Sequence, residues 1–288
     1  MATCIKAVSD NIPPGETVFF RAFFAIPVII VWLMIQHDLR DGLKTSNPLG
    51  HFWRGLIGTS AMGLGFAALG LLPLPEVTAI SYAAPVLTVI LAAMFLGEKL
   101  RVFRLTAVAL GLLGVVVILS PRLSVLEQNT TSTLEALGAM MMLTSAVFIA
   151  MAQVLLRKLV DTEKTPAIVF YFSVSAALLS LLTIPFGWVM PTPQEAALMI
   201  VSGLLGGLGQ ICLTSSYRYA ETAVIAPFEY TSILLAVASG YWFFNEVPTN
   251  TVLVGVALVI AAGLIIIYRE RQLGLESRQQ RKVSTPQG

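Results

Sequence analysis

Glu229 has the clearest potential for chemistry, because it is an acid inside an otherwise apolar stretch that runs from Thr222 to Phe244. If that stretch is a helix, Glu229 lies about 10 Å from its start. A charge at the centre of a membrane-spanning helix costs about 2.5–3.5 kcal/mol, so even off-centre it needs a cavity or a partner. We expect Glu229 to bind substrate or to act as a protonation switch. The alternative is a structural acceptor paired with Arg54, Arg218 or a tyrosine hydroxyl.

Two tyrosines extend this candidate site. Tyr230 follows Glu229, and Pro227 can free nearby backbone groups for a ligand. Tyr82 lies in another apolar stretch, and Thr78 shares its helical face at a spacing of four residues. A flat ligand would stack on the tyrosine rings. The alternative for Tyr82 is a hydrogen bond between helices.

Two amides and one arginine also lie inside apolar stretches. Gln153 and Gln210 are expected either to contact substrate or to bond across helices, which is the usual role of amides in membrane spans. Arg21 lies about one turn into its stretch, near Glu16 and Asp10. We therefore expect a structural or interfacial role for Arg21 rather than substrate contact.

Glu98 and Glu246 each end an apolar stretch. A carboxylate at the C-terminus of a helix is unfavourable for the helix dipole, so each is expected to have a partner. We interpret both acids as structural or gating elements.

The composition of the whole chain is that of a membrane protein. The chain has 288 residues, of which 56% are hydrophobic and 12% charged, and its mean hydropathy is +0.82. Soluble domains carry about 25% charged residues. Soluble enzymes, nucleic-acid-binding proteins and disordered proteins are therefore excluded, and we expect an all-α polytopic membrane protein.

Polar residues, prolines and glycines divide the apolar sequence into nine stretches long enough to span a membrane. Met1–Val8 is apolar but too short to be another. The spans are Thr17–Ile35, Phe52–Leu72, Val77–Leu96, Phe103–Ser120, Leu134–Leu156, Pro166–Val189, Ala196–Tyr217, Thr222–Phe244 and Thr251–Tyr268. Residues 270–288 are predicted to be a disordered polar tail.

The basic residues indicate an orientation. Of the 18 Lys and Arg residues, 15 fall in or beside loops on one predicted side of the membrane. Lys and Arg concentrate in cytoplasmic loops. We therefore expect a multi-pass protein of the bacterial cytoplasmic (inner) membrane, with a cytoplasmic C-terminus.

A weak internal repeat at an offset of 148 residues pairs Tyr82 with Tyr230 and Glu98 with Glu246. The charge pattern places Glu98 and Glu246 on opposite sides, which predicts two inverted repeats of five helices each, at 1–121 and 134–269. The first helix of this ten-helix plan is incomplete. We expect the natural gene product to begin upstream; the alternative is a genuine nine-span protein.

Over nearly its whole length the chain resembles the drug/metabolite transporter superfamily, and in particular tandem EamA domains. The resemblance rests on Pro85-Val86-Leu87 through Leu96-Gly97-Glu98-Lys99-Leu100, followed by a helix with Gly111 and Gly114, and on Arg21. The second copy departs from it, with Asn245 before Glu246 and Ile233 where the first copy has Pro85. Family members carry amino acids, nucleosides, sugars, vitamins and drugs.

The resemblance implies a secondary transporter that moves a small metabolite by alternating access. Riboflavin is our candidate substrate, on the layout around Phe19–Phe24. The alternatives are an exporter of amino acids, other metabolites or drugs, a non-transporting membrane subunit, and an intramembrane enzyme acting on lipid. The enzyme lacks support because His37 and His51 are expected to be solvated loop residues.

The expected partners are a small-molecule substrate and the lipid bilayer, with no nucleic acid. A proton or another coupling ion and a homodimer remain open. No cofactor and no metal are expected.

Overall fold

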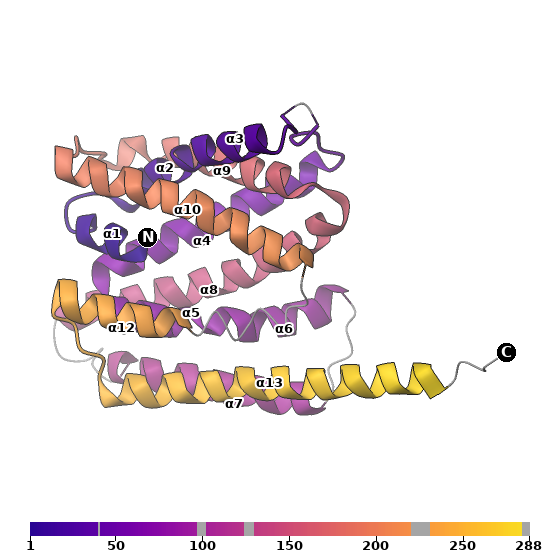
Figure 1. The fold of residues 1–288 in the computed structure, drawn as a ribbon. Coiled ribbons are helices and arrows are strands. Elements are labelled where there is room, and N and C mark those ends of the chain that lie inside the picture. The colour runs from indigo at the N-terminus through magenta and orange to yellow at the C-terminus, as the bar shows by residue number, and fades with distance from the viewer. Residues whose placement is uncertain (40, 97–101, 124–129, 220–230, 284–288) are drawn as a thin grey trace.

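The computed structural model describes residues 1–39, 41–96, 102–123, 130–219 and 231–283. Every regular element in these ranges is helical, as the sequence predicts. The long helices run side by side along one common direction, so that their connections gather at two opposite ends of a bundle (Figure 1). Four of the predicted functional residues, Glu98, Pro227, Glu229 and Tyr230, lie outside the described residues.

The helices form the body of the described chain. In order they are α1 (Ala2–Val8), α2 (Pro14–Phe23), α3 (Ala25–Ile35), α4 (Pro48–Leu71), α5 (Leu74–Ser81), α6 (Ala83–Leu96), α7 (Val102–Leu123), α8 (Thr130–Thr162), α9 (Thr165–Leu181), α10 (Pro193–Tyr219), α12 (Thr231–Phe244) and α13 (Asn250–Val283). A short 3₁₀ turn, η1 (Ile184–Phe186), follows α9.

Two predicted spans are each divided into two helices. The break between α2 and α3 is at Phe24, and the break between α5 and α6 is at Tyr82. Each break precedes a proline by three residues, at Pro27 and Pro85. Proline lacks an N–H group and its ring clashes with the carbonyl four residues earlier, which interrupts the helical ladder.

Two predicted boundaries are wrong. The span expected to reach Val189 ends as α9 at Leu181, because Pro185 disfavours continuation and Gly187 then adopts φ 95°. The tail expected to be disordered is instead helical as far as Val283, where α13 ends. Its Glu, Arg and Gln residues are good helix formers, so polarity alone does not end the helix.

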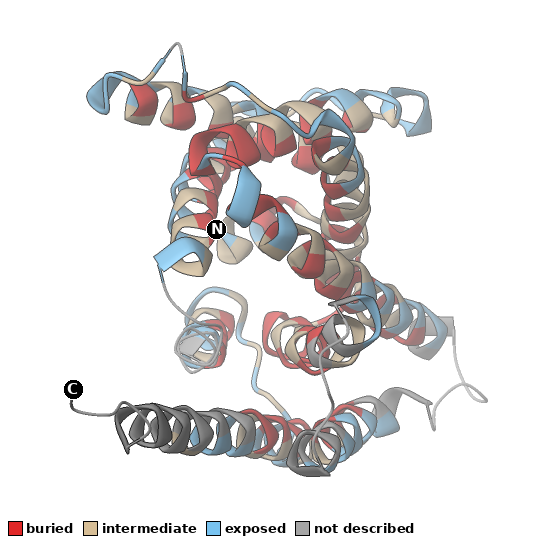
Figure 2. Cartoon of the chain, turned by 90° about the vertical axis from the view of Figure 1, so that its right-hand side faces the viewer, coloured by how far each residue is buried: buried red, intermediate tan, exposed pale blue. Residues whose placement is uncertain are grey.

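The outer faces of the bundle suit a lipid environment. Within the described ranges, four helical stretches are long and apolar enough to cross a membrane: Pro14–Ile35, Pro48–Leu71, Thr133–Thr162 and Pro193–Tyr219. Exposed faces are rich in large apolar side chains, among them Ile35 at 71% exposure and Leu234 at 69% (Figure 2). A water-soluble monomer rarely exposes such surfaces.

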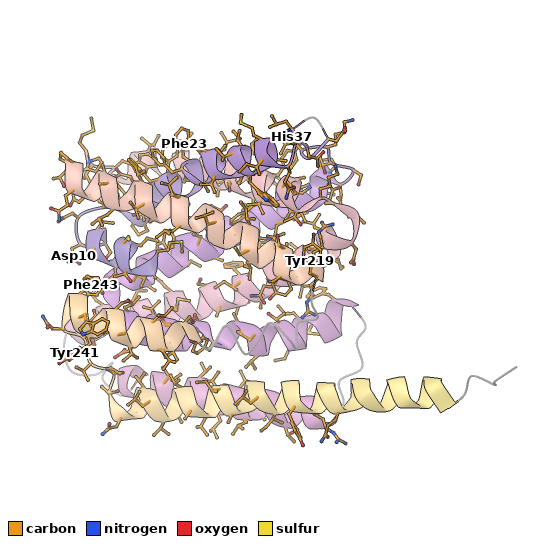
Figure 3. All side chains as sticks on the ribbon, in the orientation of Figure 1. Asp10, Phe23, His37, Tyr219, Tyr241 and Phe243 are labelled. Atoms are coloured by element: carbon orange, nitrogen blue, oxygen red, sulfur yellow. The ribbon has the colours of Figure 1, made fainter. Side chains whose placement is uncertain are left out.

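Exposed aromatic side chains lie near both ends of the bundle. Tyr241 and Phe243 lie at one end and Tyr219 at the other (Figure 3). Tyr and Trp concentrate where a membrane meets water, because their rings are apolar and their tips are polar. The fold is that of an all-α, multi-pass membrane protein.

Candidate functional site

At one end of the bundle, here called the Glu246 end, a Glu246–Lys6 pair binds two helix termini, one through each side chain. Glu246 Oε2 accepts a 2.7 Å hydrogen bond from Leu74 N in the first turn of α5, and Glu246 Oε1 lies 3.5 Å from Lys6 Nζ. Lys6 Nζ also donates to the carbonyls of Leu69 and Leu72 at 2.8 Å. Acids are favourable at helix N-termini and cations at C-termini, so this network holds α1, α4, α5 and α12 together.

The opposite end, here called the Glu163 end, has a second carboxylate network. Glu163 follows α8, and its Oε1 accepts hydrogen bonds from Ser46 N, Ser46 Oγ and Asn47 N at 2.8–2.9 Å. Arg218 of α10 donates to the Glu163 carbonyl and to Thr165 Oγ1. The network therefore joins the α3–α4 loop, the α8–α9 connection and α10.

His51 belongs to this network, and the prediction that it is a solvated loop residue is wrong. Asn47 caps α4 by accepting a hydrogen bond from Gly50 N, which places His51 in the first helical turn rather than in a loop. The His51 side chain is 4% exposed, and its Nε2 lies 3.5 Å from Glu163 Oε2. His37, in contrast, is exposed.

The ionised form of Glu163 is favoured. Burial by itself raises the pKa of this carboxyl, but hydrogen bonds from Ser46 and the adjacent His51 outweigh it. The pKa of Glu163 therefore lies below its ordinary value. At neutral pH the network at this end is built on a carboxylate.

Between the two ends, two arginines approach one aromatic ring. The guanidinium carbon of Arg54, on α4, lies 4.3 Å from the centroid of Phe172 on α9, and that of Arg21, on α2, lies 5.8 Å from it. Arg21 is 7% exposed and Arg54 is 6% exposed. Arg21 therefore does not point to the membrane surface, and its neighbour Glu16 accepts from Val189 N instead of pairing with it.

Glycines make room for both arginine side chains. A Cβ on Gly58 would lie 2.4 Å from Arg54 Nη1, and a Cβ on Gly206 of α10 would lie 3.0 Å from Arg21 Nε. Gln210 and Thr214 follow Gly206 at successive four-residue spacings, so the three share one face of α10.

That face of α10 carries unsatisfied polar atoms. Gln210 Nε2 and Thr214 Oγ1 are buried, and neither has a hydrogen-bond partner within the described part of the chain. Buried polar groups are nearly always hydrogen-bonded, so such atoms indicate a place for a ligand or water. Gln210 is thus the predicted site residue whose surroundings best suit binding.

The other described candidates already have partners. Tyr82 is 4% exposed, and its hydroxyl lies 2.9 Å from Ser232 Oγ on α12. Thr78 donates to the Leu74 carbonyl of its own helix, and Gln153 Oε1 accepts from Thr88 at 3.0 Å. Tyr82 and Gln153 therefore make the interhelical bonds that were their alternative interpretation.

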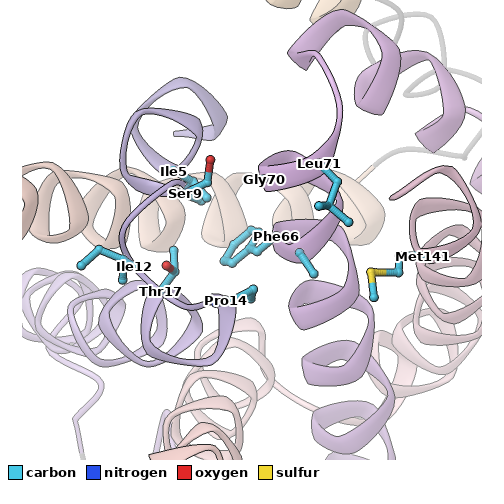
Figure 4. A pocket seen from close by; sticks show the side chains of 10 residues that line it. Ile5, Ser9, Ile12, Pro14, Thr17, Phe66, Gly70, Leu71 and Met141 are labelled. Carbon is cyan, nitrogen blue, oxygen red and sulfur yellow. The ribbon is translucent and has the colours of Figure 1, made fainter. Parts of the chain in front are cut away.

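A cavity of about 260 Å³ lies between α1, α2, α4 and α8 toward the Glu246 end (Figure 4). Its lining is almost wholly apolar: Ile5, Ser9, Ile12, Pro14, Thr17, Phe66, Ala67, Gly70, Leu71 and Met141. Thr17 precedes Arg21 by four residues on the same face of α2, so the cavity approaches the arginine pair along α2.

Sequence reasoning did not assign a binding role to Arg54, Phe172 or Thr214. Arg54 falls near the start of the predicted span Phe52–Leu72 and was considered only as a structural partner of Glu229; in the structure it lies six residues after Pro48, within α4. That position was an available signal. Nothing in the sequence indicated that Phe172 lies beside both arginines.

Residues 1–120 and 136–268 match the EamA-like transporter family. The chain belongs to this family. Residues 76–186 also match solute carrier family 35. A solved crystal structure shares the fold with a TM-score of 0.68 at 20% sequence identity, over 94% of this chain and 96% of that one.

Relatives with named activities transport metabolites. The S-adenosylmethionine uptake transporter of Rickettsia bellii is 28% identical, over 93% of this chain and 88% of the relative. The pseudopaline exporter of Pseudomonas aeruginosa is 30% identical over the same shares. Neither relative is named for riboflavin, so these relatives do not support riboflavin as the substrate. This EamA-family chain is a metabolite transporter of the membrane.

Proposed function

We propose that this EamA-family chain is a secondary transporter that carries a small metabolite across the bacterial cytoplasmic membrane by alternating access. The observation that carries the proposal is the arrangement of polar groups along the bundle. Arg21, Arg54 and Gln210 lie inside it, between one carboxylate network at the Glu246 end and another at the Glu163 end. An interior binding site with a closable network at each end is what alternating access requires.

S-adenosylmethionine is the first substrate to test. One relative is named for its uptake, and the match covers nearly the whole of both chains. S-adenosylmethionine contains polar and charged groups, which suit the unsatisfied polar atoms of the interior better than a wholly apolar compound would. The relatives include an importer and an exporter, so both directions are tested.

The charge pattern supports a cytoplasmic location for the Glu163 end. Lys44, Lys158, Lys164 and Arg218 lie at or beside this end. Basic residues are retained in cytoplasmic loops. The Glu246 end, with the cavity beside Ser9 and Thr17, would then face the outside.

The test uses the purified full chain in liposomes. Labelled S-adenosylmethionine is added outside, with and without a proton gradient, and counterflow is measured with unlabelled compound inside. Saturable uptake above protein-free liposomes is expected. Dependence on the gradient would identify the proton as coupling ion.

If S-adenosylmethionine is not taken up, it is excluded as the substrate. A second assay then compares the metabolites that accumulate in bacteria expressing the chain with those in vector controls. If no metabolite changes despite good membrane expression, the transport proposal is wrong, and a non-transporting subunit becomes the better interpretation.

A further inference from the structure

We propose that Arg21 and Arg54 together bind a carboxylate of the transported substrate in the interior of the bundle. This inference rests on the proposed transport function and names the chemical group at its site. Three helices build the site: Arg21 comes from α2, Arg54 from α4, and Phe172, whose ring both guanidinium groups approach, from α9.

The first argument is the missing counter-charge. In the described part of the chain, neither arginine makes a salt bridge or a hydrogen bond, and the Nε atoms of both are buried without a partner. Buried charges in proteins are normally paired or bind a ligand. Two adjacent buried cations without an acid therefore leave a place for an anion.

The second argument concerns what Phe172 can supply. A cation over an aromatic face is stabilised, and Arg54 at 4.3 Å is well placed for this. The ring offers no hydrogen-bond acceptor in the plane of the guanidinium, however, so the N–H groups stay unsatisfied. A carboxylate would satisfy two N–H groups of one guanidinium at once.

The third argument is that three described acids, Glu16, Glu163 and Glu246, already have hydrogen-bond or ion-pair partners other than the two arginines. Glu16 precedes Arg21 by five residues and accepts from Val189 N. Glu163 accepts from the α3–α4 loop, and Glu246 accepts from α5 and lies beside Lys6. Among the described acids, none lies within ion-pair distance of Arg21 or Arg54. Within the described ranges no acid supplies the counter-ion, which supports an anionic group of the ligand in that role.

The polar face of α10 completes the site. Gly206 lies against Arg21 Nε, and Gln210 and Thr214 continue its face along the helix with buried, unpaired Nε2 and Oγ1 atoms. These groups can bind the polar remainder of a substrate whose carboxylate is held by the arginines. The apolar cavity beside Thr17 provides the approach from the Glu246 end.

The binding experiment compares two ligands that differ only in the carboxylate. S-adenosylmethionine and decarboxylated S-adenosylmethionine are titrated into the full chain in lipid nanodiscs. The wild type is expected to bind the first at least about 10-fold more tightly. Arg21→Gln and Arg54→Gln should each weaken binding of S-adenosylmethionine by about 10- to 100-fold and change binding of the decarboxylated compound by less than about 3-fold. Equal losses for both ligands would overturn the assignment.

Inorganic phosphate distinguishes the two kinds of oxyanion. If millimolar phosphate stabilises the wild type but not the Arg54→Gln variant, while S-adenosylmethionine binds neither, the arginines bind a phosphate group and the carboxylate assignment is wrong. Competition between S-adenosylmethionine and phosphate, with tighter binding of S-adenosylmethionine, supports it.

A third experiment needs no substrate, so it separates failure of this inference from failure of the transport proposal. Arg21→Met and Arg54→Met are compared with Arg218→Met, whose arginine bonds Thr165 Oγ1 and the Glu163 carbonyl. Removing an uncompensated buried cation should raise the apparent melting temperature of the ligand-free protein by about 2–4 °C.

Arg218→Met, in contrast, should lower the melting temperature, because its partners lose their donor. If Arg21→Met and Arg54→Met also lower it, the two arginines are structural cations with an internal counter-ion, and the inference is wrong. This result would stand whether or not S-adenosylmethionine is transported.

Discussion

Lys6 Nζ lies 3.5 Å from Glu246 Oε1, and this pair connects α1 to the chain just beyond α12. Each side chain also binds a helix terminus of the appropriate sign. Lys6 donates to the last carbonyls at the end of α4, and Glu246 accepts from Leu74 N at the start of α5. The partner expected for Glu246 is therefore present, and we propose that the pair is part of the gate at the Glu246 end.

A double-mutant cycle tests this gate. Glu246→Gln keeps an oxygen for Leu74 N and removes the charge, and Lys6→Met removes the cation. Because the charges lie 3.5 Å apart and the side chains are only 14% and 17% exposed, a coupling of at least about 1 kcal/mol in unfolding is expected, above that of a fully exposed pair. Transport should fall in each single variant. Independent, additive effects on both stability and transport would show that the pair is not a gate.

Glu163 gives a pH prediction. Because the pKa of Glu163 is lower in the folded protein than its ordinary value, the ionised carboxylate stabilises the fold above the unfolded pKa of about 4.3. This stabilisation is lost as the pH falls from about 5 through the lowered folded pKa.

The apparent melting temperature of the wild type should therefore fall more steeply below pH 5 than that of Glu163→Gln. Asp10→Asn, at an exposed acid outside this network, serves as the control and should follow the wild-type curve. If Glu163→Gln shows the same pH dependence as wild type, Glu163 does not control the acid stability of this end.

Gly203 and Gly209 give a matched pair of substitutions on one helix. A Cβ on Gly203 would lie 2.6 Å from Phe24 Cβ and 2.9 Å from the Phe20 carbonyl oxygen, whereas nothing lies within 4 Å of a Cβ on Gly209. Gly203→Ala should destabilise the protein by about 1–3 kcal/mol, because α10 must move away from α2. Gly209→Ala should be neutral or slightly stabilising. Similar melting temperatures for both variants would contradict this close packing.

Removing the hydroxyl of Tyr82 tests whether it makes only a structural hydrogen bond or also contacts the substrate. Tyr82→Phe and Ser232→Ala each remove the 2.9 Å contact between α12 and the break after α5. If the bond is only structural, both variants should lose about 0.5–1.5 kcal/mol and transport equally well. A loss of transport in Tyr82→Phe alone would identify the ring hydroxyl as a substrate ligand.

Glu229 remains a prediction from the sequence. Glu229→Gln is expected to reduce transport at least about 10-fold while membrane expression stays at the wild-type level, because a protonatable acid in a span is expensive unless it is used. Asp41→Asn controls for loss of an exposed acid. Unchanged transport in Glu229→Gln would make Glu229 a structural acceptor.

The membrane location, the helical class and the family resemblance could all be predicted from the amino-acid sequence. The membrane location and helical class follow from composition and from long apolar runs, since every backbone group inside a bilayer must bond within its own helix. The family resemblance rests instead on the run from Pro85 to Leu100. The breaks at Phe24 and Tyr82 were also predictable, because Pro27 and Pro85 act locally. The end of α9 was missed although Pro185 also acts locally, and the end of α13 was missed because polar residues can still be good helix formers.

Which polar residues lie in contact could not be predicted from the sequence, because it depends on how the helices pack. Arg21, Arg54 and Phe172 are far apart in the chain and become neighbours because three helices pack together. The burial of His51 against Glu163 has the same origin. Hydropathy reports the environment of a whole helix, whereas side-chain contacts depend on how each helix is rotated against its neighbours, and that rotation is set by packing between segments distant in sequence.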